Sequence, residues 1–181
     1  AHTATRLRDG LGLVYGGHGA TGGTGPVLPP ELYDPAANRF GVLPAPETIR
    51  RANHAAVGCE DGTLLIVGGE DDGGPLASVL LFDPVTLQFA RAADLLTGRA
   101  FARGLVLTDG RVLTAGGDTP GGFATDTVEL LRSDGLRRSG PTLGTPRVLH
   151  SVTPLVITGK VLVFGGLDRD RNVLASAEIF E

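Results

Sequence analysis

Short apolar stretches alternate with polar, glycine-containing turns along the whole of this 181-residue chain. The clearest example is a series of four apolar stretches separated by short polar segments: 55–59, 63–67, 78–83 and 88–90. The first two are joined by Glu60-Asp61-Gly62, and Asp-Gly supplies the positive φ angles that a two-residue hairpin connection needs. Because the stretches are short and the turns tight, the pattern predicts an antiparallel meander of four strands. The continuous apolar character of 63–67 predicts a strand covered on both faces.

The same order of strands and turns occurs four times. The third strand of each copy begins at Glu31, Leu80, Glu129 or Glu178, and successive copies are separated by 49 residues. A fixed period of this size indicates an array of one supersecondary unit. One small sheet cannot cover both of its faces, so we expect the copies to stack around an axis as a β-propeller. A linear β-solenoid fits less well, because its coils are usually shorter and lack hairpin turns.

Four motifs recur with the period. They are Arg-x-x-His (Arg51/His54 and Arg147/His150), Asp-Gly-x-Val-Leu (109–113), a Gly-Gly pair, and Glu-Leu-Tyr-Asp-Pro (31–35). Together they resemble the kelch repeat, in the Gly/Pro-rich version common in large bacterial proteins, over the entire chain. The resemblance implies an all-β, kelch-like β-propeller of about four blades, each a four-stranded antiparallel meander. The expected blades are 1–46, 47–96, 97–144 and 145–181, and the last lacks its outer strand.

The sequence departs from the family pattern at several positions. It has no Trp, and Phe40 and Phe89 stand on the fourth strand, where the family usually has one. Arg138 at this position in the third copy predicts a frayed or solvated outer strand, and Ala102 replaces the motif histidine. Kelch propellers usually have six or seven blades. We therefore expect a fragment of a longer polypeptide, with a complete small propeller or a half-ring that pairs with a second chain as alternatives.

Composition excludes several classes of partner. The net charge is −4 and no Lys/Arg-rich run exists, so we expect neither a nucleic acid nor an anionic membrane as partner. No apolar run is long enough to span a membrane, and no signal peptide is visible. An extracellular or periplasmic location is favoured by the family resemblance alone. Cys59 is the single cysteine, which excludes an internal disulfide; we expect it to be a small buried apolar residue.

Three histidines, His2, His54 and His150, are candidates for a metal site, since imidazole side chains often bind zinc. They recur at one motif position, however, and therefore belong to different blades. We predict no metal or other cofactor, and expect the motif arginines and histidines to satisfy backbone groups between blades. The residues assigned a structural role are Gly16, Gly17, Gly68, Gly69, Gly116, Gly117, Gly165, Gly166, Arg51, His54, Arg147 and His150.

The loops after the Gly-Gly pairs break the repeat and should emerge on one face of the propeller. Charged loop residues on a rigid scaffold often bind partners, although simple solvation of exposed loops also accounts for them. The candidate binding residues are His18, Glu70, Asp71, Asp72, Asp118, Asp168, Arg169, Asp170 and Arg171. Glu70-Asp71-Asp72 lacks the alternating ligand spacing of a dedicated calcium loop. The glycine-rich segment 19–25 lacks the following Lys-Ser/Thr and helix of a phosphate loop.

Three functions are compatible with this organisation. The first is a non-catalytic scaffold that binds a protein or glycan partner through these loops. The second is a fragment of an enzyme resembling the copper radical oxidases, which need a Tyr–Cys crosslink, a second Tyr and two His ligands. Cys59, Tyr15 and Tyr33 are present, but both tyrosines stand at repeat positions filled elsewhere by packing residues. The third is a structural spacer in a larger exported protein. The sequence favours the scaffold.

Overall fold

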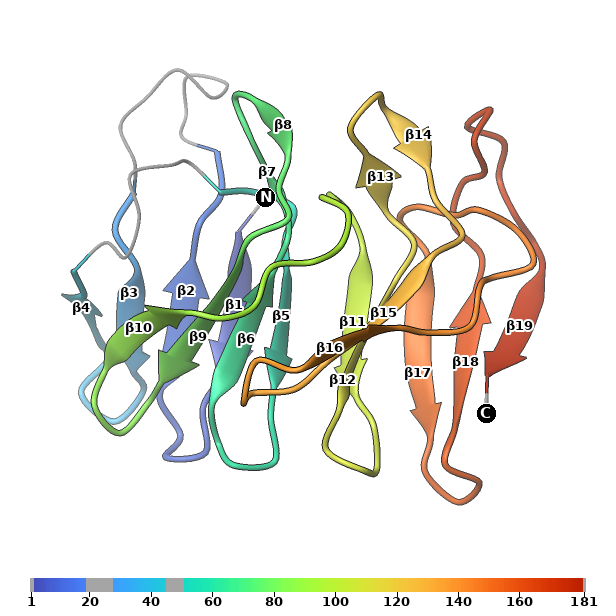
Figure 1. The fold of residues 1–181 in the computed structure, drawn as a ribbon. Coiled ribbons are helices and arrows are strands. Elements are labelled where there is room, and N and C mark those ends of the chain that lie inside the picture. The colour runs from blue at the N-terminus through green and yellow to red at the C-terminus, as the bar shows by residue number, and fades with distance from the viewer. Residues whose placement is uncertain (1, 19–27, 45–50, 181) are drawn as a thin grey trace.

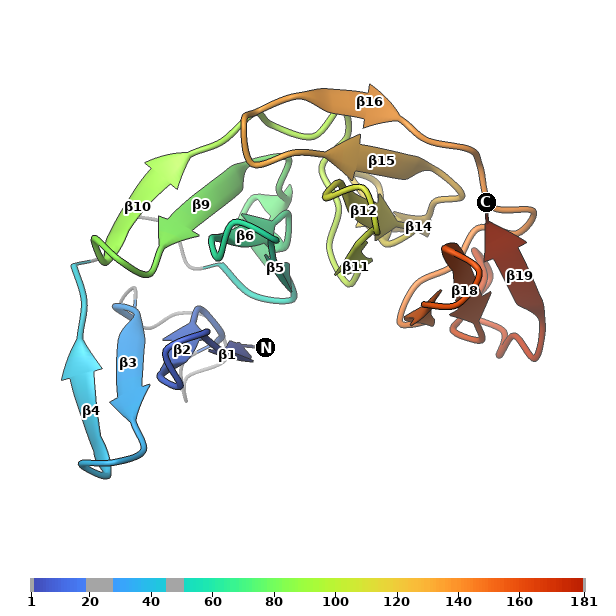
Figure 2. The same cartoon turned by 90° about the horizontal axis from the view of Figure 1, so that it is seen from below.

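A computed structural model describes residues 2–18, 28–44 and 51–180. These residues form only strands, turns and irregular segments, and no helix occurs among them. Four antiparallel sheets lie side by side in an arc (Figures 1 and 2). Seen from below in Figure 2, the first strands of the sheets lie on the concave side of the arc, and the fourth strands of the first three sheets lie on its convex side. The all-β propeller fold expected from the repeat is confirmed.

The first two sheets have four strands each, and every neighbouring pair within them is antiparallel. The first consists of β1 (Thr3–Arg6), β2 (Gly12–Tyr15), β3 (Glu31–Asp34) and β4 (Arg39–Val42). The second consists of β5 (Ala55–Gly58), β6 (Leu64–Val67), β9 (Val79–Asp83) and β10 (Gln88–Arg91). In both sheets the strands follow one another in sequence order from the inner to the outer edge, as a meander requires.

The third and fourth sheets continue the arc. The third consists of β11 (Arg103–Val106), β12 (Val112–Ala115), β15 (Val128–Leu131) and β16 (Arg137–Ser139). The fourth has three strands among the described residues: β17 (Ser151–Leu155), β18 (Lys160–Phe164) and β19 (Ala177–Phe180). The strand β16, which we expected to be frayed or solvated, pairs with β15 over three residues and is fully exposed. The residue bounds of the blades stay a prediction.

The core lies between the sheets rather than within one. On β6, Leu64 and Ile66 pack toward the first sheet, whereas Leu65 and Val67 pack toward the third. All four residues of β6 are buried, because successive side chains of a strand point to opposite faces and both faces are covered. On β18 of the fourth sheet, by contrast, the face that carries Val161 and Val163 is buried against the third sheet and the other face is more exposed.

The turns between the first two strands of each sheet differ in one detail from the expectation. Of Asp61 and Gly62, only Gly62 has a positive φ, of 94°. Asp61 instead accepts the backbone N–H of Thr63 with its Oδ1 at 2.9 Å. The aspartate therefore closes the turn with its side chain, and a single left-handed glycine completes the reversal.

The Gly-Gly pairs join neighbouring sheets through the backbone. The N–H of Gly17 donates to the carbonyl oxygen of Arg51 at 2.8 Å, and Gly69 and Gly117 make the same bond to Arg99 and Arg147. Each acceptor is the motif arginine of the following repeat. A Cβ on the first glycine of these three pairs would collide with that same carbonyl oxygen. Glycine is therefore required there by a close approach of two backbones as well as by its positive φ.

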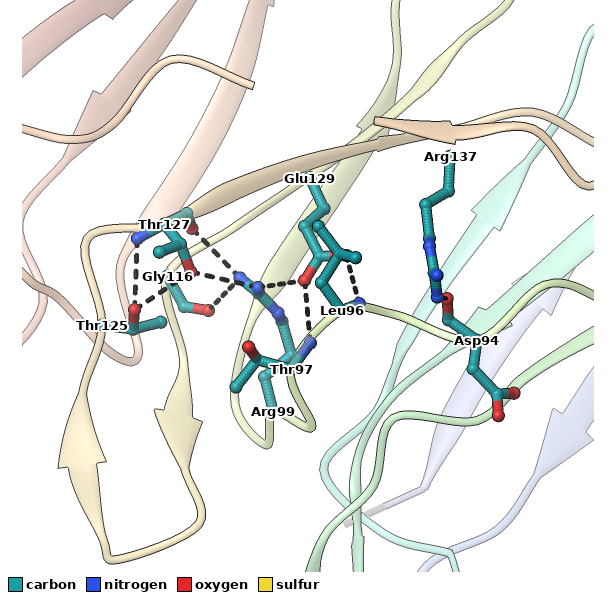
Figure 3. A network of polar contacts seen from close by, with 9 residues as sticks. All are labelled: Asp94, Leu96, Thr97, Arg99, Gly116, Thr125, Thr127, Glu129 and Arg137. Carbon is teal, nitrogen blue, oxygen red and sulfur yellow. Dashed lines mark hydrogen bonds and ion pairs between the residues drawn. The ribbon is translucent and has the colours of Figure 1, made fainter. Parts of the chain in front are cut away.

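The side chains of the same arginines act within their own repeat. Arg99 donates to the carbonyl oxygens of Gly116 at 3.1 Å and Thr127 at 3.0 Å, and forms an ion pair with Glu129 at 2.5 Å (Figure 3). The carboxylate of Glu129 also accepts the backbone N–H of Leu96 at 2.7 Å. The guanidinium is fully buried, and a charge so placed is stable only when it is paired and hydrogen-bonded.

Candidate functional site

The segments that follow the second, third and fourth Gly-Gly pairs emerge at one edge of the arc, opposite the Asp-Gly turns (Figure 1). They are more ordered than the polar loops that the sequence predicts. The second repeat forms a small hairpin from β7 (Glu70–Asp71) and β8 (Gly74–Pro75), and the third forms one from β13 (Asp118–Thr119) and β14 (Phe123–Ala124). In the fourth repeat, residues 168–172 form a turn. Residues 19–25 lie outside the described residues.

The third and fourth of these segments contact each other. Arg171 Nη2 donates to Asp118 Oδ2 at 2.8 Å and to the carbonyl oxygen of Gly122 at 3.2 Å. Arg169 Nε donates to the carbonyl oxygen of Ala124 at 3.2 Å. Asp118 is buried, and its Oδ1 has no hydrogen-bond partner among the described residues. These contacts hold two neighbouring loops together.

The first and second segments are linked in a similar way. His18 Nε2 lies 3.8 Å from Glu70 Oε1, and Asn53 Nδ2 donates to the same oxygen at 2.6 Å. The carbonyl oxygen of Asn53 in turn accepts the N–H of Phe101, from the third repeat. Several predicted binding residues are thus engaged with neighbouring repeats, and we call the loop segments together the rim.

Two predicted binding residues shape their own turns. Asp71 Oδ1 accepts the N–H of Gly73 at 2.8 Å. Asp168 Oδ1 accepts the N–H groups of Asn172 at 2.8 Å and of Asp170 at 2.9 Å. Hydrogen bonds from the backbone and side chain of Asn172 lower the pKa of Asp168 below its usual range. Both carboxylates are therefore part of the loop geometry, whereas Asp72 and Asp170 are exposed.

A cleft of about 450 Å³ lies between the third and fourth segments. It combines apolar, cationic and anionic side chains, and its lining is Thr119, Phe123, Ala124, Thr125, Arg169 and Asp170. The Phe123 side chain is 62% exposed. Sequence reasoning concentrated on charged residues and missed it. The signal was present, since Phe123 is the single large apolar residue in the segment 118–126, which otherwise consists of small, polar and proline residues.

The motif histidines His54 and His150 are buried, and neither lines this cleft, whereas His2 is exposed. Burial, reinforced by the nearby charge of Arg51, lowers the pKa of His54 to about 3. Burial and the charge of Arg147 lower the pKa of His150 to about 4. Both imidazoles are therefore neutral at physiological pH. Among the described residues, no cluster of three or more His, Cys, Asp or Glu side chains could hold a metal ion.

The residues considered for copper radical chemistry are spread over different parts of the fold. Cys59 packs in the apolar cluster between the second and third sheets, and burial raises the pKa of its thiol. Tyr15 packs between the first and second sheets. The hydroxyl of Tyr33 donates to Asn38 Oδ1 at 3.0 Å. Because Cys59 and Tyr15 lie on opposite sides of the second sheet, this pair of residues does not form the crosslinked centre of such an enzyme.

In the described parts of the chain, no helix has the length and apolar character needed to cross a membrane.

Comparison with known proteins agrees with the architecture. Residues 50–96 match the model of the Kelch motif. No curated protein matches the chain. Among solved structures, the chain resembles that of YjhT, a kelch-type propeller protein, with a TM-score of 0.77 and 14% identity. The match covers 99% of this chain and 68% of that one, and at this identity it concerns the fold alone. The chain thus contains a kelch motif at residues 50–96 and has the fold of a kelch-type β-propeller.

Proposed function

We propose that the chain is a non-catalytic binding scaffold whose ligand-binding face is the rim formed by the segments after the Gly-Gly pairs. The observation that carries this proposal is the cleft between the third and fourth segments. It brings an exposed aromatic ring, Phe123, together with Arg169 and Asp170. Aromatic and arginine side chains are enriched at the energetic centres of protein interfaces. Aromatic rings are also amphipathic surfaces against which a sugar ring can pack.

The contacts between segments support a preorganised site. Arg171 bridges Asp118 and Gly122, and Arg169 reaches Ala124 across the same gap. Loops held in this way lose little conformational entropy when a partner binds, which favours affinity. The exposed carboxylate of Asp170, which lines the cleft, adds an acceptor that a ligand hydroxyl or amide can use. A protein or a glycan with exposed donors is therefore the expected partner.

The test compares two exposed apolar residues on opposite parts of the molecule. Phe123 lies on the rim cleft, and Val85, which is 89% exposed, lies in the turn between β9 and β10. A photo-crosslinking residue is placed at each position in turn, and the chain is exposed to extracts of its source and to an immobilised glycan panel. We expect specific crosslinks or glycan retention that depend on position 123 and are absent at position 85.

Point variants then separate binding from folding. Phe123→Ser and Asp170→Asn should weaken the captured interaction at least about tenfold while leaving the melting temperature unchanged, and Val85→Ser should change neither. Asp71 and Asp168 are less suitable, because their substitution would alter the shape of the turns. Equal capture at positions 123 and 85, or normal binding by both rim variants, would contradict the proposed binding face.

A further inference from the structure

One hairpin turn at the lower edge in Figure 1 departs from the other three. The first three sheets connect their first two strands through Arg8-Asp9-Gly10, Glu60-Asp61-Gly62 and Thr108-Asp109-Gly110. The fourth sheet uses residues 156–159, between the paired residues Leu155 and Lys160. Val156 is 76% exposed and Ile157 is fully exposed. The fourth turn therefore begins with two exposed apolar residues, where each of the others carries an aspartate.

The residue before Asp-Gly lies against the turn glycine of the next sheet, and its length decides how far the junction is filled. Arg8 Nη2 donates to the carbonyl oxygen of Glu60, and Arg8 Cδ lies 3.6 Å from a Cβ placed on Gly62. Glu60 Oε2 lies 3.4 Å from a Cβ placed on the turn glycine of the third sheet. At the junction of the third and fourth sheets the residue is Thr108, whose Oγ1 lies 3.8 Å from a Cβ placed on Gly159. Threonine has the shortest of the three side chains and fills its junction least.

A pocket of about 230 Å³ lies at this junction. We call it the junction pocket, and both of the sheets that form its walls are present in the chain. Its apolar lining is Val106, Leu107, Pro154, Leu155, Val156 and Val161. A cavity of about 150 Å³ with an apolar lining is large enough to hold benzene. The junction pocket therefore has room for the ring of an aromatic side chain.

The charges at the pocket favour a cation beside that ring. Glu60 lines the pocket and is exposed, and its carboxylate has no hydrogen bond or ion pair among the described residues. Lys160, the one basic residue of the lining, already has an interaction of its own. The whole chain has a net charge of −4, which also attracts a basic partner. The pocket thus combines an apolar space with an acceptor for a positive charge.

We propose that the junction pocket binds a protein partner through an aromatic side chain that is followed by a lysine or arginine. The ring fills the apolar space, and the cation pairs with Glu60. Val156 and Ile157 extend the apolar contact around the ring and exclude water, as the surroundings of an interface anchor do. A free small molecule would leave this collar exposed, which favours a protein. The pocket lies at the edge opposite the rim, so the inference does not depend on the proposed function.

The test titrates the isotope-labelled chain with capped tetrapeptides and follows its amide chemical shifts. The peptides are Gly-Phe-Lys-Gly, Gly-Phe-Glu-Gly and Gly-Ser-Lys-Gly. We expect the Phe-Lys peptide to shift the amides of Val106 and Leu155. It should bind at least about tenfold more tightly than the Ser-Lys peptide, because only a ring fills the pocket. It should bind roughly threefold more tightly than the Phe-Glu peptide, which is the size of effect that an exposed ion pair produces.

Variants of the chain separate the pocket from its charge. Thr108→Arg gives this junction the side chain that Arg8 supplies at the first, and it should weaken the Phe-Lys peptide at least about tenfold by filling the space. Glu60→Gln should remove the preference for the Phe-Lys over the Phe-Glu peptide and keep the preference for Phe over Ser. Val156→Ser changes an exposed residue of the collar and should weaken the Phe-Lys peptide about threefold. The control, Val85→Ser, should change nothing.

Several outcomes would overturn the inference. They are the absence of any shift, equal binding of the Phe-Lys and Ser-Lys peptides, and normal binding by Thr108→Arg. If that variant does not fold, normal binding by Val156→Ser has the same meaning. Shifts confined to the rim would place the peptide on another surface and overturn the inference too. Shifts of Val106 that depend on the concentration of the chain alone would identify a second copy as the occupant, with the same consequence.

Discussion

Gly116 and Gly165 occupy the same position in the third and fourth repeats and have nearly the same backbone conformation, with φ of 60° and 69°. They differ in what lies against them. The carbonyl oxygen of Arg147 and the ring of His150 lie directly over Gly116, whereas a Cβ on Gly165 would meet only the carbonyl oxygen of Leu174, at an ordinary contact distance of 3.5 Å. The comparison shows that one repeat motif meets two requirements: a left-handed turn inside the repeat, and close contact with the next one.

Substitution at these two glycines separates the requirements. Gly116→Val should prevent folding, and Gly116→Ala should cost about 3 kcal/mol more in the free energy of unfolding than Gly165→Ala, because only the former adds a backbone clash to the conformational strain. Urea unfolding followed by circular dichroism measures both variants. Equal costs would mean that the contact between repeats contributes nothing to the glycine requirement.

The arginines of the same two repeats provide a second contrast. Arg99 and Arg147 are both fully buried, but the Glu129 side chain is 3% exposed and that of Glu178 is 21% exposed. Arg99→Met should therefore destabilise the chain by about 3–5 kcal/mol, because it leaves the Glu129 carboxylate buried without a cation. Arg147→Met should cost less, because water reaches Glu178. Chemical denaturation of both variants checks the order; a larger cost for Arg147→Met would contradict it.

The buried histidines predict a pH dependence. The folded-state pKa values of His54 and His150 are about 3 and about 4, below the unfolded value of 6.5, so the unfolded chain binds more protons. The free energy of unfolding is therefore highest above pH 6.5. As the pH falls from 6.5 toward the folded-state pKa values, each histidine lowers the free energy of unfolding by about 1.4 kcal/mol per pH unit. Unfolding measured between pH 7 and 5, roughly the range before carboxylates titrate, should show it. His54→Gln and His150→Gln should each remove the contribution of one histidine to the slope of the unfolding free energy against pH. An unchanged slope in the double variant would show that the two histidines do not cause this pH dependence.

The smallest expected effect concerns the third motif residue, which has a positive φ in three repeats. Asn53, Phe101 and Leu149 have φ of 54°, 55° and 58°. Asparagine tolerates this conformation better than leucine, and Leu149 is 49% exposed, so little packing is lost on replacement. Leu149→Asn should raise the free energy of unfolding by up to about 1 kcal/mol. Thermal unfolding detects such a gain, and a lower melting temperature would show that Leu149 packs more than its exposure indicates.

Much of this fold was predictable from local pattern. The continuous apolar run of 63–67 predicted a strand covered on both faces, and β6 is buried at every position. The Asp-Gly turns and the 49-residue spacing predicted the meander. The order within the loops was not predicted, since the hairpins β7–β8 and β13–β14 are held partly by contacts with other repeats. The bond from Arg171 to Asp118 spans 53 residues, and no local pattern reports it.

The repeating unit follows from the order of amino acids alone, because strand alternation, turn chemistry and glycine placement act over a few neighbouring residues. Which residues each unit presents to its neighbour depends instead on the three-dimensional arrangement of the sheets. This arrangement placed the carbonyl of Arg51 against Gly17, buried Arg99 with Glu129, and brought Phe123 and Arg169 to one cleft. These contacts depend on how whole sheets stack, and stacking is set by the summed packing of many side chains from segments distant in the chain.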